Sequence, residues 1–440
     1  MARTTFRPRV LSARMAAMDS LGGPEVAVLG GGFGGLYTAL RLCSLDWSGG
    51  PRPQVTLVDR SERFSFSPML YELVTGTATA WEVAPLYEDL LAGTGIDFVH
   101  GEIRGVNEQE RVVTIALSGR DKEYTSERQL PYDQCVLAFG IQPQTTLVDG
   151  ASEHALQFQT AEHAMGLKRR LIELRQPGAA VSSPRVAIVG GGYVGVELAA
   201  NLAGMGGSER VTLIHRSASL LPNAVDFSRG EAHRRLLDAG VEVLLETDVK
   251  RVSPDALTLS PRSVAGAVGS DVGSAGASYE FPADLTVWTA GTRPASVVSS
   301  LGLPLNGNGR IVTDATLRVS GRPRTFALGD AAAVMDATGT TVPATAQAAM
   351  QQADYAAWNV RAAVRSQPPL PFRYTALGEM LSLGNDAASV AALGQLVKLS
   401  GPLAATPRRA VYAARMPTSQ QASLVLTHAH PIHRAAPSPP

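Results

Sequence analysis

The sequence predicts an α/β fold with two doubly wound, parallel-sheet domains. Two glycine-rich turns, at residues 30–35 and 190–195, have the same spacing of glycines. Each follows a short apolar run, Glu25–Leu29 or Arg185–Val189, and each precedes an alanine-rich stretch with helical periodicity, at 34–45 and 194–203. A strand, a glycine turn and a helix in this order form a Rossmann-like dinucleotide-binding unit. The chain is therefore predicted to contain two such domains and to bind two dinucleotides.

Three glycines in each turn are candidate phosphate-binding residues. Glycine permits a tight turn and lets the backbone approach a pyrophosphate, which then lies at the helix N-terminus and its partial positive charge. One such motif is weak evidence, but two in the same context are difficult to explain as ordinary turns. The candidates are Gly30, Gly32 and Gly35 in the first turn, and Gly190, Gly192 and Gly195 in the second.

The residue that follows the second strand of each predicted unit indicates which nucleotide the unit binds. In the first unit the strand 54–58 ends at Asp59, whose carboxylate is placed to bond a ribose hydroxyl pair, as in the adenosine half of FAD. In the second unit the strand Arg210–Ile214 ends at His215 and Arg216, with no acid. Arg216 is either a phosphate contact, which favours NADPH or tolerance of both nicotinamide nucleotides, or a solvated surface residue.

The composition limits the classes of function. With 39 basic and 39 acidic residues in 440, the chain has no net charge at pH 7, which argues against a nucleic-acid partner. Cys43 and Cys135 are far apart and lack metal-ligand spacing, so neither a disulfide framework nor a metal site is expected. No apolar run is long enough for a membrane-spanning helix.

Three segments differ in composition from the rest of the chain. The first 22 residues are basic and hydroxyl-rich and contain no acid before Asp19, which predicts either an organelle transit segment or a disordered tail. Residues 262–278 form a low-complexity stretch of Gly, Ala, Ser and Val, which predicts a loop insertion. Residues 431–440, rich in Pro and Ser, predict a disordered tail.

Further strand ends carry glycines where the backbone is expected to pass close to another group. One apolar strand, ending at 139, leads into Gly140, and another, at 285–289, leads into Gly291. A third, at 325–328, leads into Gly329 and Asp330. Asp330 is a candidate partner for a ribityl hydroxyl of FAD, although an aspartate after a strand is more often a helix cap.

With these motifs in this order, residues 25–416 resemble the pyridine-nucleotide flavoprotein oxidoreductases of glutathione-reductase fold. The resemblance implies a discontinuous FAD-binding domain, at 23–150 and 310–375, with an NAD(P)-binding domain at 151–309 inserted in it. It assigns Asp330 to the ribityl chain and Glu197 to a place beside the nicotinamide, although the helix dipole alone also favours a glutamate there. Its other candidate cofactor-binding residues are Arg60, Pro68, Gly140, Gly291, Gly329 and Ala346.

The lack of a cysteine pair and the presence of two glutamines on one predicted helix indicate which branch of this superfamily the chain resembles. Disulfide reductases and sulfide:quinone oxidoreductases of this fold need paired cysteines, whereas Cys43 has no second sulfur in its region. Residues 63–70, 346–352 and 371–384 instead resemble type II NAD(P)H:quinone oxidoreductases. Gln347 and Gln351 share one helical face, where an amide either donates to a quinone carbonyl or faces water.

The resemblance to the type II enzymes implies a two-step reaction. Hydride passes from NAD(P)H to FAD, and two electrons then reduce a prenylquinone of the plastoquinone, demethylphylloquinone or ubiquinone type, without proton pumping. Glu197, Gln347 and Gln351 are the candidate catalytic residues. Because the flavin carries the redox chemistry, the protein is expected to supply positioning and electrostatics rather than a strong acid or base.

The C-terminal region, 376–430, is predicted to form a quinone, membrane or dimer surface. Residues 387–405 are mostly apolar and small, and the basic or aromatic residues Arg408, Arg409, Tyr412 and Arg415 follow. Such a segment either lies in a bilayer interface with its basic side chains at the headgroups or covers a dimer or interdomain surface.

Residues 401–418 resemble the plant and cyanobacterial branch, whose members reduce prenylquinones in plastids. This resemblance implies peripheral association with a membrane surface or lipid body. A chloroplast location, at a thylakoid or plastoglobule, is favoured over a mitochondrion. A homodimer is compatible with the family.

Two other functions stay open on the sequence. A soluble reductase of the same fold passes electrons to ferredoxin, monodehydroascorbate or dioxygen and needs no apolar quinone cleft. A nucleotide-binding regulatory protein uses its redox state to gate a partner, although the intact motifs with Glu197 and Asp330 argue against this.

Overall fold

The computed structural model describes residues 22–118, 124–176, 182–262, 277–384 and 387–427. The predicted transit segment, the low-complexity loop and the C-terminal tail lie almost entirely outside these residues. The described chain divides into two compact units. Unit 1 comprises residues 22–62, 87–141 and 294–374, and unit 2 comprises residues 63–86, 142–293 and 375–427.

In the described chain, unit 1 is built on a seven-stranded sheet in the order β18–β6–β1–β2–β3–β4–β5. The strands from β18 to β3 are parallel, and β3, β4 and β5 are antiparallel. The central strand β1 is apolar and almost wholly buried, as expected for a parallel strand covered on both faces. The strands are β1 (Glu25–Leu29), β2 (Gln54–Asp59), β3 (Ile96–Asn107), β4 (Val112–Ser118), β5 (Tyr124–Pro131), β6 (Gln134–Leu137) and β18 (Thr325–Ala327).

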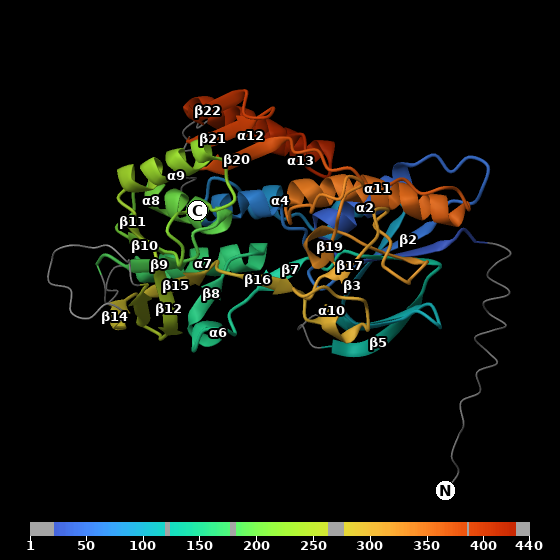
Figure 1. The fold of residues 1–440 in the computed structure, drawn as a ribbon, viewed down its shortest axis with the longest axis horizontal. Helices are drawn as coiled ribbons and strands as arrows, with labels where there is room; N and C mark the ends of the chain where they lie inside the picture. Colours follow the sequence, from blue (N-terminus) through green and yellow to red (C-terminus); the bar gives the residue numbers. More distant parts are fainter. Residues whose placement is uncertain (1–21, 119–123, 177–181, 263–276, 385–386, 428–440) are drawn as a thin grey trace, which may run out of the picture. The chain divides into compact units, whose positions relative to one another are not determined.

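Two long helices of unit 1, α2 and α11, pack against each other (Figure 1). Thr345 caps α11, since its hydroxyl oxygen accepts from the backbone N–H of Ala348 at 3.2 Å. The helical segments are α2 (Phe33–Ser44), α5 (Tyr87–Leu91), α10 (Val297–Ser300), η2 (Gly329–Ala331) and α11 (Ala346–Val364). A small two-stranded sheet joins β17 (Ile311–Val312) to β19 (Ala332–Ala333).

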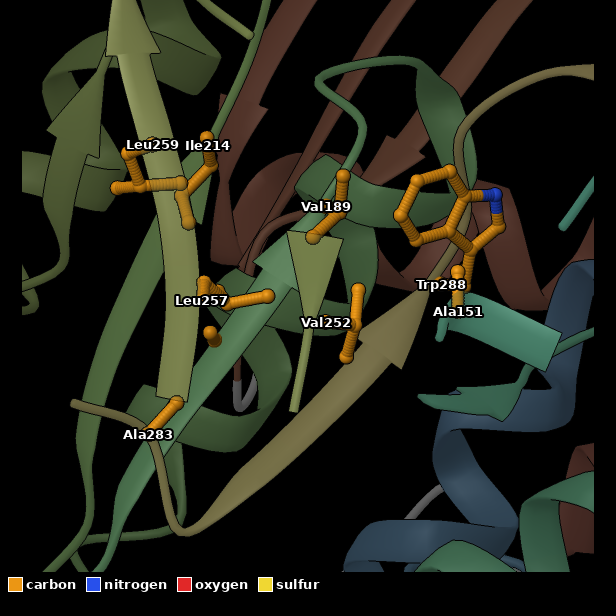
Figure 2. Close-up of a cluster of buried hydrophobic side chains, with 9 residues drawn as sticks. Ala151, Val189, Ile214, Val252, Leu257, Leu259, Ala283 and Trp288 are labelled. Atoms are coloured by element: carbon orange, nitrogen blue, oxygen red, sulfur yellow. The ribbon is translucent and has the colours of Figure 1, made fainter. Parts of the chain in front are cut away.

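In the described chain, unit 2 contains a five-stranded parallel sheet in the order β11–β10–β9–β15–β8. A three-stranded antiparallel sheet, β12–β13–β14, accompanies it. Figure 2 shows the shared core, in which Val189 and Trp288 of the first sheet and Val252 and Leu257 of the second are buried. The strands are β8 (Ala155–Gln157), β9 (Arg185–Val189), β10 (Arg210–Ile214), β11 (Glu242–Leu244), β12 (Thr247–Val252), β13 (Ala256–Pro261), β14 (Tyr279–Pro282) and β15 (Leu285–Trp288).

The C-terminal part of unit 2 is a three-stranded antiparallel sheet covered by α12 (Figure 1). Its strands are β20 (Gly378–Ser382), β21 (Ala388–Ala392) and β22 (Val397–Gly401). Residues 387–405 are therefore a β-hairpin followed by the start of a helix, not one apolar segment lying along a bilayer. Leu393, Gly394 and Gln395, which all have positive φ angles, form the turn of this hairpin.

Helices of unit 2 surround these sheets. They are η1 (Ser67–Met69), α3 (Leu70–Thr75), α4 (Ala80–Val83), α6 (Ala151–His154), α7 (Ala161–Leu174), α8 (Tyr193–Gly204), α9 (Asp226–Asp238), α12 (Pro402–Ala413) and α13 (Ser419–Thr427). Two of the unit boundaries fall within β7 (Ile141–Pro143) and β16 (Thr292–Pro294), which pair with each other. Among the described residues, no helix combines the length and the apolar composition that crossing a membrane requires.

Candidate functional site

The first glycine loop, in unit 1, has room for a ligand at one glycine and no room for side chains at the other two. Gly30 has φ +102°, and an added Cβ there would lie 2.3 Å from the carbonyl oxygen of Ala138. A Cβ at Gly35 would lie 1.7 Å from the carbonyl oxygen of Gly30, whereas a Cβ at Gly32 would meet no protein atom within 4 Å. Gly32 is also the N-cap of α2 and provides no side-chain cap. The loop thus presents open space at a helix N-terminus, which suits a pyrophosphate.

The second loop, in unit 2, repeats this geometry. Gly190 has φ +120°, and a Cβ there would lie 2.7 Å from the hydroxyl oxygen of Thr289. A Cβ at Gly195 would lie 1.8 Å from the carbonyl oxygen of Gly190, while Gly192 again faces open space and starts α8 without a side-chain cap. Both loops are therefore suited to the same kind of ligand.

The two loops differ in the side chain that holds the second glycine of the motif. In unit 1 the N–H of Gly31 donates to Asp59 Oδ2, and the N–H of Ser61 donates to Asp59 Oδ1 at 2.7 Å. In unit 2 the N–H of Gly191 donates to Nδ1 of His215 at 3.1 Å. Burial raises the pKa of Asp59 but lowers that of His215, because desolvation disfavours the charged form of each. The neighbouring Arg60 and Arg216 are both exposed.

Asp330 and Gly329 lie at the end of β18, in unit 1. Gly329 has φ +70°, and its N–H donates to Gln352 Oε1, on α11, at 2.6 Å. Burial raises the pKa of Asp330, and Arg310 partly offsets this. Among the described residues Asp330 has no hydrogen-bond partner, so its carboxylate is available to a polyol. Gln352 lies within residues 346–352, which resemble the type II enzymes, but no pattern in the sequence pointed to its contact with Gly329.

The glutamines of α11 have different roles. Gln347 Oε1 accepts the hydroxyl of Tyr374 at 3.0 Å, so the structure brings together two of the three segments that resemble the type II enzymes. This bond orients the amide so that its NH₂ group is the donor side. Gln351 and Ala346 are half-buried on the same helix. Gln352 is buried and supports Gly329 rather than a substrate.

The remaining candidates belong to unit 2 or to its boundaries. Pro68 lies in η1 beside the buried Phe66 and Met69. Gly140 and Gly291 have φ values of +63° and +68°, which favour glycine at the end of each strand. The carbonyl of Gly291 accepts from the N–H of Gln144 at 3.1 Å.

Glu197 is buried on α8, with 8% of its surface exposed. Its Oε1 accepts the backbone N–H of Ser382, on β20, at 2.9 Å. Burial raises the pKa of Glu197 to about 8, an effect that Ser382 and the positive charge of Arg408 oppose and that Glu72 reinforces. Asn201, one helical turn further, donates to the backbone carbonyl of Glu197 and to the hydroxyl of Ser382. The C-terminal strand β20 thus fixes the position of Glu197.

We expect the buried Glu197 to make stability depend on pH. The folded pKa of about 8 lies above the ordinary value of 4.5, so between these values the folded protein holds a proton that the unfolded chain has released. The free energy of unfolding should therefore fall as pH rises through this window. Glu197→Gln, which cannot ionise, should remove that fall, so that the variant gains stability relative to the parent toward pH 8.

Thermal midpoints of both proteins across this pH window test the prediction. Glu88→Gln, at an exposed position, is the control and should follow the parent at every pH. Parallel profiles of the parent and Glu197→Gln would contradict a buried, protonated carboxyl.

Arg408 is buried in unit 2, which rules out for this residue the alternative in which its side chain faces lipid headgroups. It is 4% exposed, and it donates to the hydroxyl of Tyr71 at 2.7 Å and to Glu72 Oε1 at 2.9 Å. Its guanidinium carbon lies 5.9 Å from the ring centre of Tyr71 and 5.2 Å from that of Tyr412. The physical reason is the buried carboxylate of Glu72, which requires a cation inside the protein. Tyr412 is buried with it, and Arg409 also approaches Glu72.

The cysteines do not form a redox pair. Cys43 and Cys135 are both free thiols. Burial raises the pKa of each thiol, and Cys135, on β6, is wholly buried. Both properties disfavour a reactive thiolate. Within the described part of the chain, no cluster of His, Cys, Asp or Glu has the composition of a metal site.

The fold and its two matching loops define a protein that binds two dinucleotides. The chain belongs to the pyridine nucleotide-disulphide oxidoreductase family, whose model matches residues 24–353.

Relatives within this family are quinone reductases by name. The chain is 42% identical to the demethylphylloquinone reductase NdbB of Synechocystis sp. over 90% of this chain and 93% of that protein. It is 39% identical to the alternative NAD(P)H-ubiquinone oxidoreductase C1, chloroplastic/mitochondrial, of Arabidopsis thaliana, over 90% of this chain and 78% of that protein. Among solved structures, it shares its fold with NDH2 from Plasmodium falciparum in complex with NADH, with a TM-score of 0.76, 17% identity and coverage of 92% and 96% of the two chains.

Proposed function

We propose that this protein is an FAD-dependent type II NAD(P)H:quinone oxidoreductase. In this reaction NAD(P)H, a proton and a quinone give NAD(P)⁺ and a quinol. The observation that carries the proposal is the pair of glycine loops with matching backbones and different second-glycine partners, Asp59 in one and His215 in the other. Two unlike dinucleotides are the ligands such a pair suits. The names of the relatives supply the quinone as acceptor.

Unit 1 fits FAD. The open space at Gly32 and the uncapped start of α2 suit the pyrophosphate, and Asp59 suits the adenosine ribose. Asp330, half-buried and without a hydrogen-bond partner for its carboxylate among the described residues, suits the ribityl hydroxyls. Bound FAD supplies two-electron chemistry by taking hydride from the nicotinamide and reducing the acceptor.

Unit 2 fits the nicotinamide nucleotide. The loop from Gly190 to Gly195 and the start of α8 suit the pyrophosphate, and Arg216 is proposed to meet a 2′-phosphate. Glu197, largely protonated near neutral pH, offers a neutral carboxyl in the buried end of this unit. A neutral carboxyl can donate a hydrogen bond as well as accept one, and Ser382 holds it in one orientation.

Gln347 is proposed to bind the quinone carbonyl. The hydroxyl of Tyr374 donates to Gln347 Oε1, which fixes the NH₂ group as the donor side of the amide. The neighbouring small residues of α11, including Ala346, leave space for a flat ring. Gln351 shares this helical face.

Replacing Gln347 with leucine should slow quinone reduction about tenfold or more, because one hydrogen bond to the reacting carbonyl is lost. Reduction of the flavin by NAD(P)H should keep its parental rate. Stopped-flow measurement of the two half-reactions tests this selectivity. Tyr374→Phe should give a smaller effect of the same kind, and Gln395→Leu, in the hairpin turn, is the control. Unchanged quinone turnover and apparent affinity in Gln347→Leu would refute the assignment.

Peripheral association with a membrane is proposed for the C-terminal sheet and α12. Leu393, Leu396 and Leu403 are 68%, 88% and 78% exposed, which is unusual for leucine, and Lys398 lies between them. These side chains suit the interface of a bilayer better than Arg408 and Tyr412, which are buried. The Arabidopsis relative is named chloroplastic/mitochondrial, and a plastid membrane is the proposed location.

Flotation with anionic liposomes tests membrane association. The parent should float with the lipid, and a Leu393→Ser, Leu396→Ser double variant should bind several-fold more weakly because two apolar side chains no longer enter the interface. Leu305→Ser, an exposed leucine of unit 1, is the control. A parent that stays with the soluble fraction would contradict the proposal.

A further inference from the structure

His215 occupies in unit 2 the position that Asp59 occupies in unit 1. Asp59 is the last residue of β2, and His215 directly follows β10. Each accepts the N–H of the second glycine of its loop, Gly191 or Gly31. The two side chains therefore perform the same structural task, which is to hold the glycine loop against the sheet.

After holding the loop, the two side chains differ in how many hydrogen-bond acceptors they can still offer to a ligand. A carboxylate has lone pairs to spare after accepting two backbone N–H groups, as Asp59 does from Gly31 and Ser61. A neutral imidazole has one acceptor nitrogen. In His215 that nitrogen is Nδ1, and it is already used by Gly191. His215 thus holds the loop but offers no acceptor to the hydroxyls of an adenosine ribose.

The surrounding contacts keep His215 in this arrangement. The N–H of Leu221 donates to the carbonyl of Gly191 at 2.8 Å, so residues 215–221 fold back onto the loop. A Cβ on Gly191 would lie 2.8 Å from Cγ of His215, which shows how closely the imidazole packs. Nε2 is buried and makes no hydrogen bond within the described chain. Burial and the charge of Arg216 lower the pKa of His215, more than an interaction with the backbone of Ser219 raises it, and so favour the neutral ring.

The charge next to this position is positive. Arg216 is exposed and follows His215 directly. An acidic residue, Glu246, lies next to residues 215–221 in space, since its backbone N–H donates to the carbonyl of Ser217 at 3.2 Å. A 2′-phosphate bound beside His215 would therefore meet a guanidinium and no carboxylate from the end of β10.

We propose that His215 is a specificity-determining residue that makes the second site select a 2′-phosphorylated adenine nucleotide, NADPH, over NADH. It locks the glycine loop as an acid would, yet it neither accepts from the 2′-hydroxyl of NADH nor repels the 2′-phosphate of NADPH. Arg216 then supplies the attraction. This inference rests on the proposed function, since it concerns which nicotinamide nucleotide the same site takes.

Binding of nucleotide fragments to the purified FAD-loaded protein tests the proposal without turnover. Adenosine 2′,5′-bisphosphate and AMP differ only in the 2′-phosphate, and calorimetry gives the affinity of each. Asp59 shows that a side chain of aspartate length reaches the equivalent glycine N–H. His215→Asp and His215→Asn are therefore a matched pair that keeps the loop contact and differs in charge.

The parent should bind the bisphosphate about tenfold or more tightly than AMP. His215→Asp should reverse this order, and His215→Asn should keep it. A purely structural role for His215 would instead weaken both ligands equally and leave their ratio unchanged, which would overturn the proposal. Equal binding of the two fragments by the parent would overturn it too, even if His215→Asp failed to fold.

The result is independent of the acceptor. A protein that prefers the bisphosphate but does not reduce quinone would refute the proposed function and not this inference. Glu246→Gln is the control for the nearby acid and should leave the ratio at the parental value.

Discussion

Replacing Gly35 with alanine should abolish stable FAD binding. The added Cβ would lie 1.7 Å from the carbonyl oxygen of Gly30 and 3.3 Å from Cβ of Ala138. The first of these contacts is with backbone, so no side-chain rotation relieves it, and α2 has to move away from β1. Because the pyrophosphate site consists of the backbone between these two elements, we expect FAD affinity to fall about a hundredfold.

The flavin-to-protein absorbance ratio after gel filtration, followed by FAD titration of the apoprotein, measures this effect. Gly166→Ala is the control, since Gly166 lies within α7 and an added Cβ there meets no atom within 4 Å. It should keep the full flavin content. Asp330→Ala, with the loop intact, should give an intermediate loss of about tenfold because one charge-assisted hydrogen bond disappears. Parental flavin content in Gly35→Ala would contradict the assignment of this loop.

Replacing Arg408 with methionine should destabilise the protein by up to about 3–5 kcal/mol, because removing the buried partner leaves the charge of Glu72 facing only the more exposed and more distant Arg409 among its described cationic partners. Both side chains are about 5% exposed, and they meet at 2.9 Å. Methionine keeps much of the volume between the rings of Tyr71 and Tyr412, so the effect should come mainly from lost charge pairing.

A double-mutant cycle separates the charge effect from packing. Adding Glu72→Gln to Arg408→Met should recover part of the loss, since the poorly compensated buried charge is gone. Arg409→Met is the matched control, because Arg409 is more exposed and lies 3.5 Å from Glu72, and it should cost less than about 1 kcal/mol. Urea unfolding of the parent, the two single variants, the double variant and the Arg409→Met control gives the energies. An Arg408→Met variant within 1 kcal/mol of the parent would contradict the buried network.

Local sequence patterns were sufficient to predict the two nucleotide-binding loops. A strand, a glycine turn and a helix are neighbours in sequence, so the spacing of Gly30, Gly32 and Gly35 carries the geometry by itself. The helices begin one residue earlier than predicted, at Phe33 and Tyr193. In each, the chain becomes helical directly after the N-cap glycine, Gly32 or Gly192. The difference between Asp59 and His215 was visible too, but the bond from Gly191 to His215 was not.

Contacts between distant residues could not be predicted in this way. Arg408 and Glu72 are 336 positions apart, and a basic residue after an apolar stretch is equally typical of a membrane interface. The apolar residues 387–405 form a hairpin because Leu393, Gly394 and Gln395 adopt positive φ angles, a turn that hydropathy does not reveal. Ser382 meets Glu197 for a similar reason, since β20 pairs with β21 and packs on α8 far from its place in sequence.

Anaerobic stopped-flow spectroscopy tests the central claim most directly. The FAD-loaded protein is first mixed with NADPH or NADH, and the reduced protein is then mixed with a short-chain naphthoquinone or benzoquinone. The proposed function predicts fast bleaching of the flavin absorbance by the nucleotide and fast recovery on addition of quinone. Fast bleaching followed by slow recovery would contradict quinone as the acceptor and favour a reductase of another substrate. A bound flavin that neither nucleotide reduces would contradict the oxidoreductase function altogether.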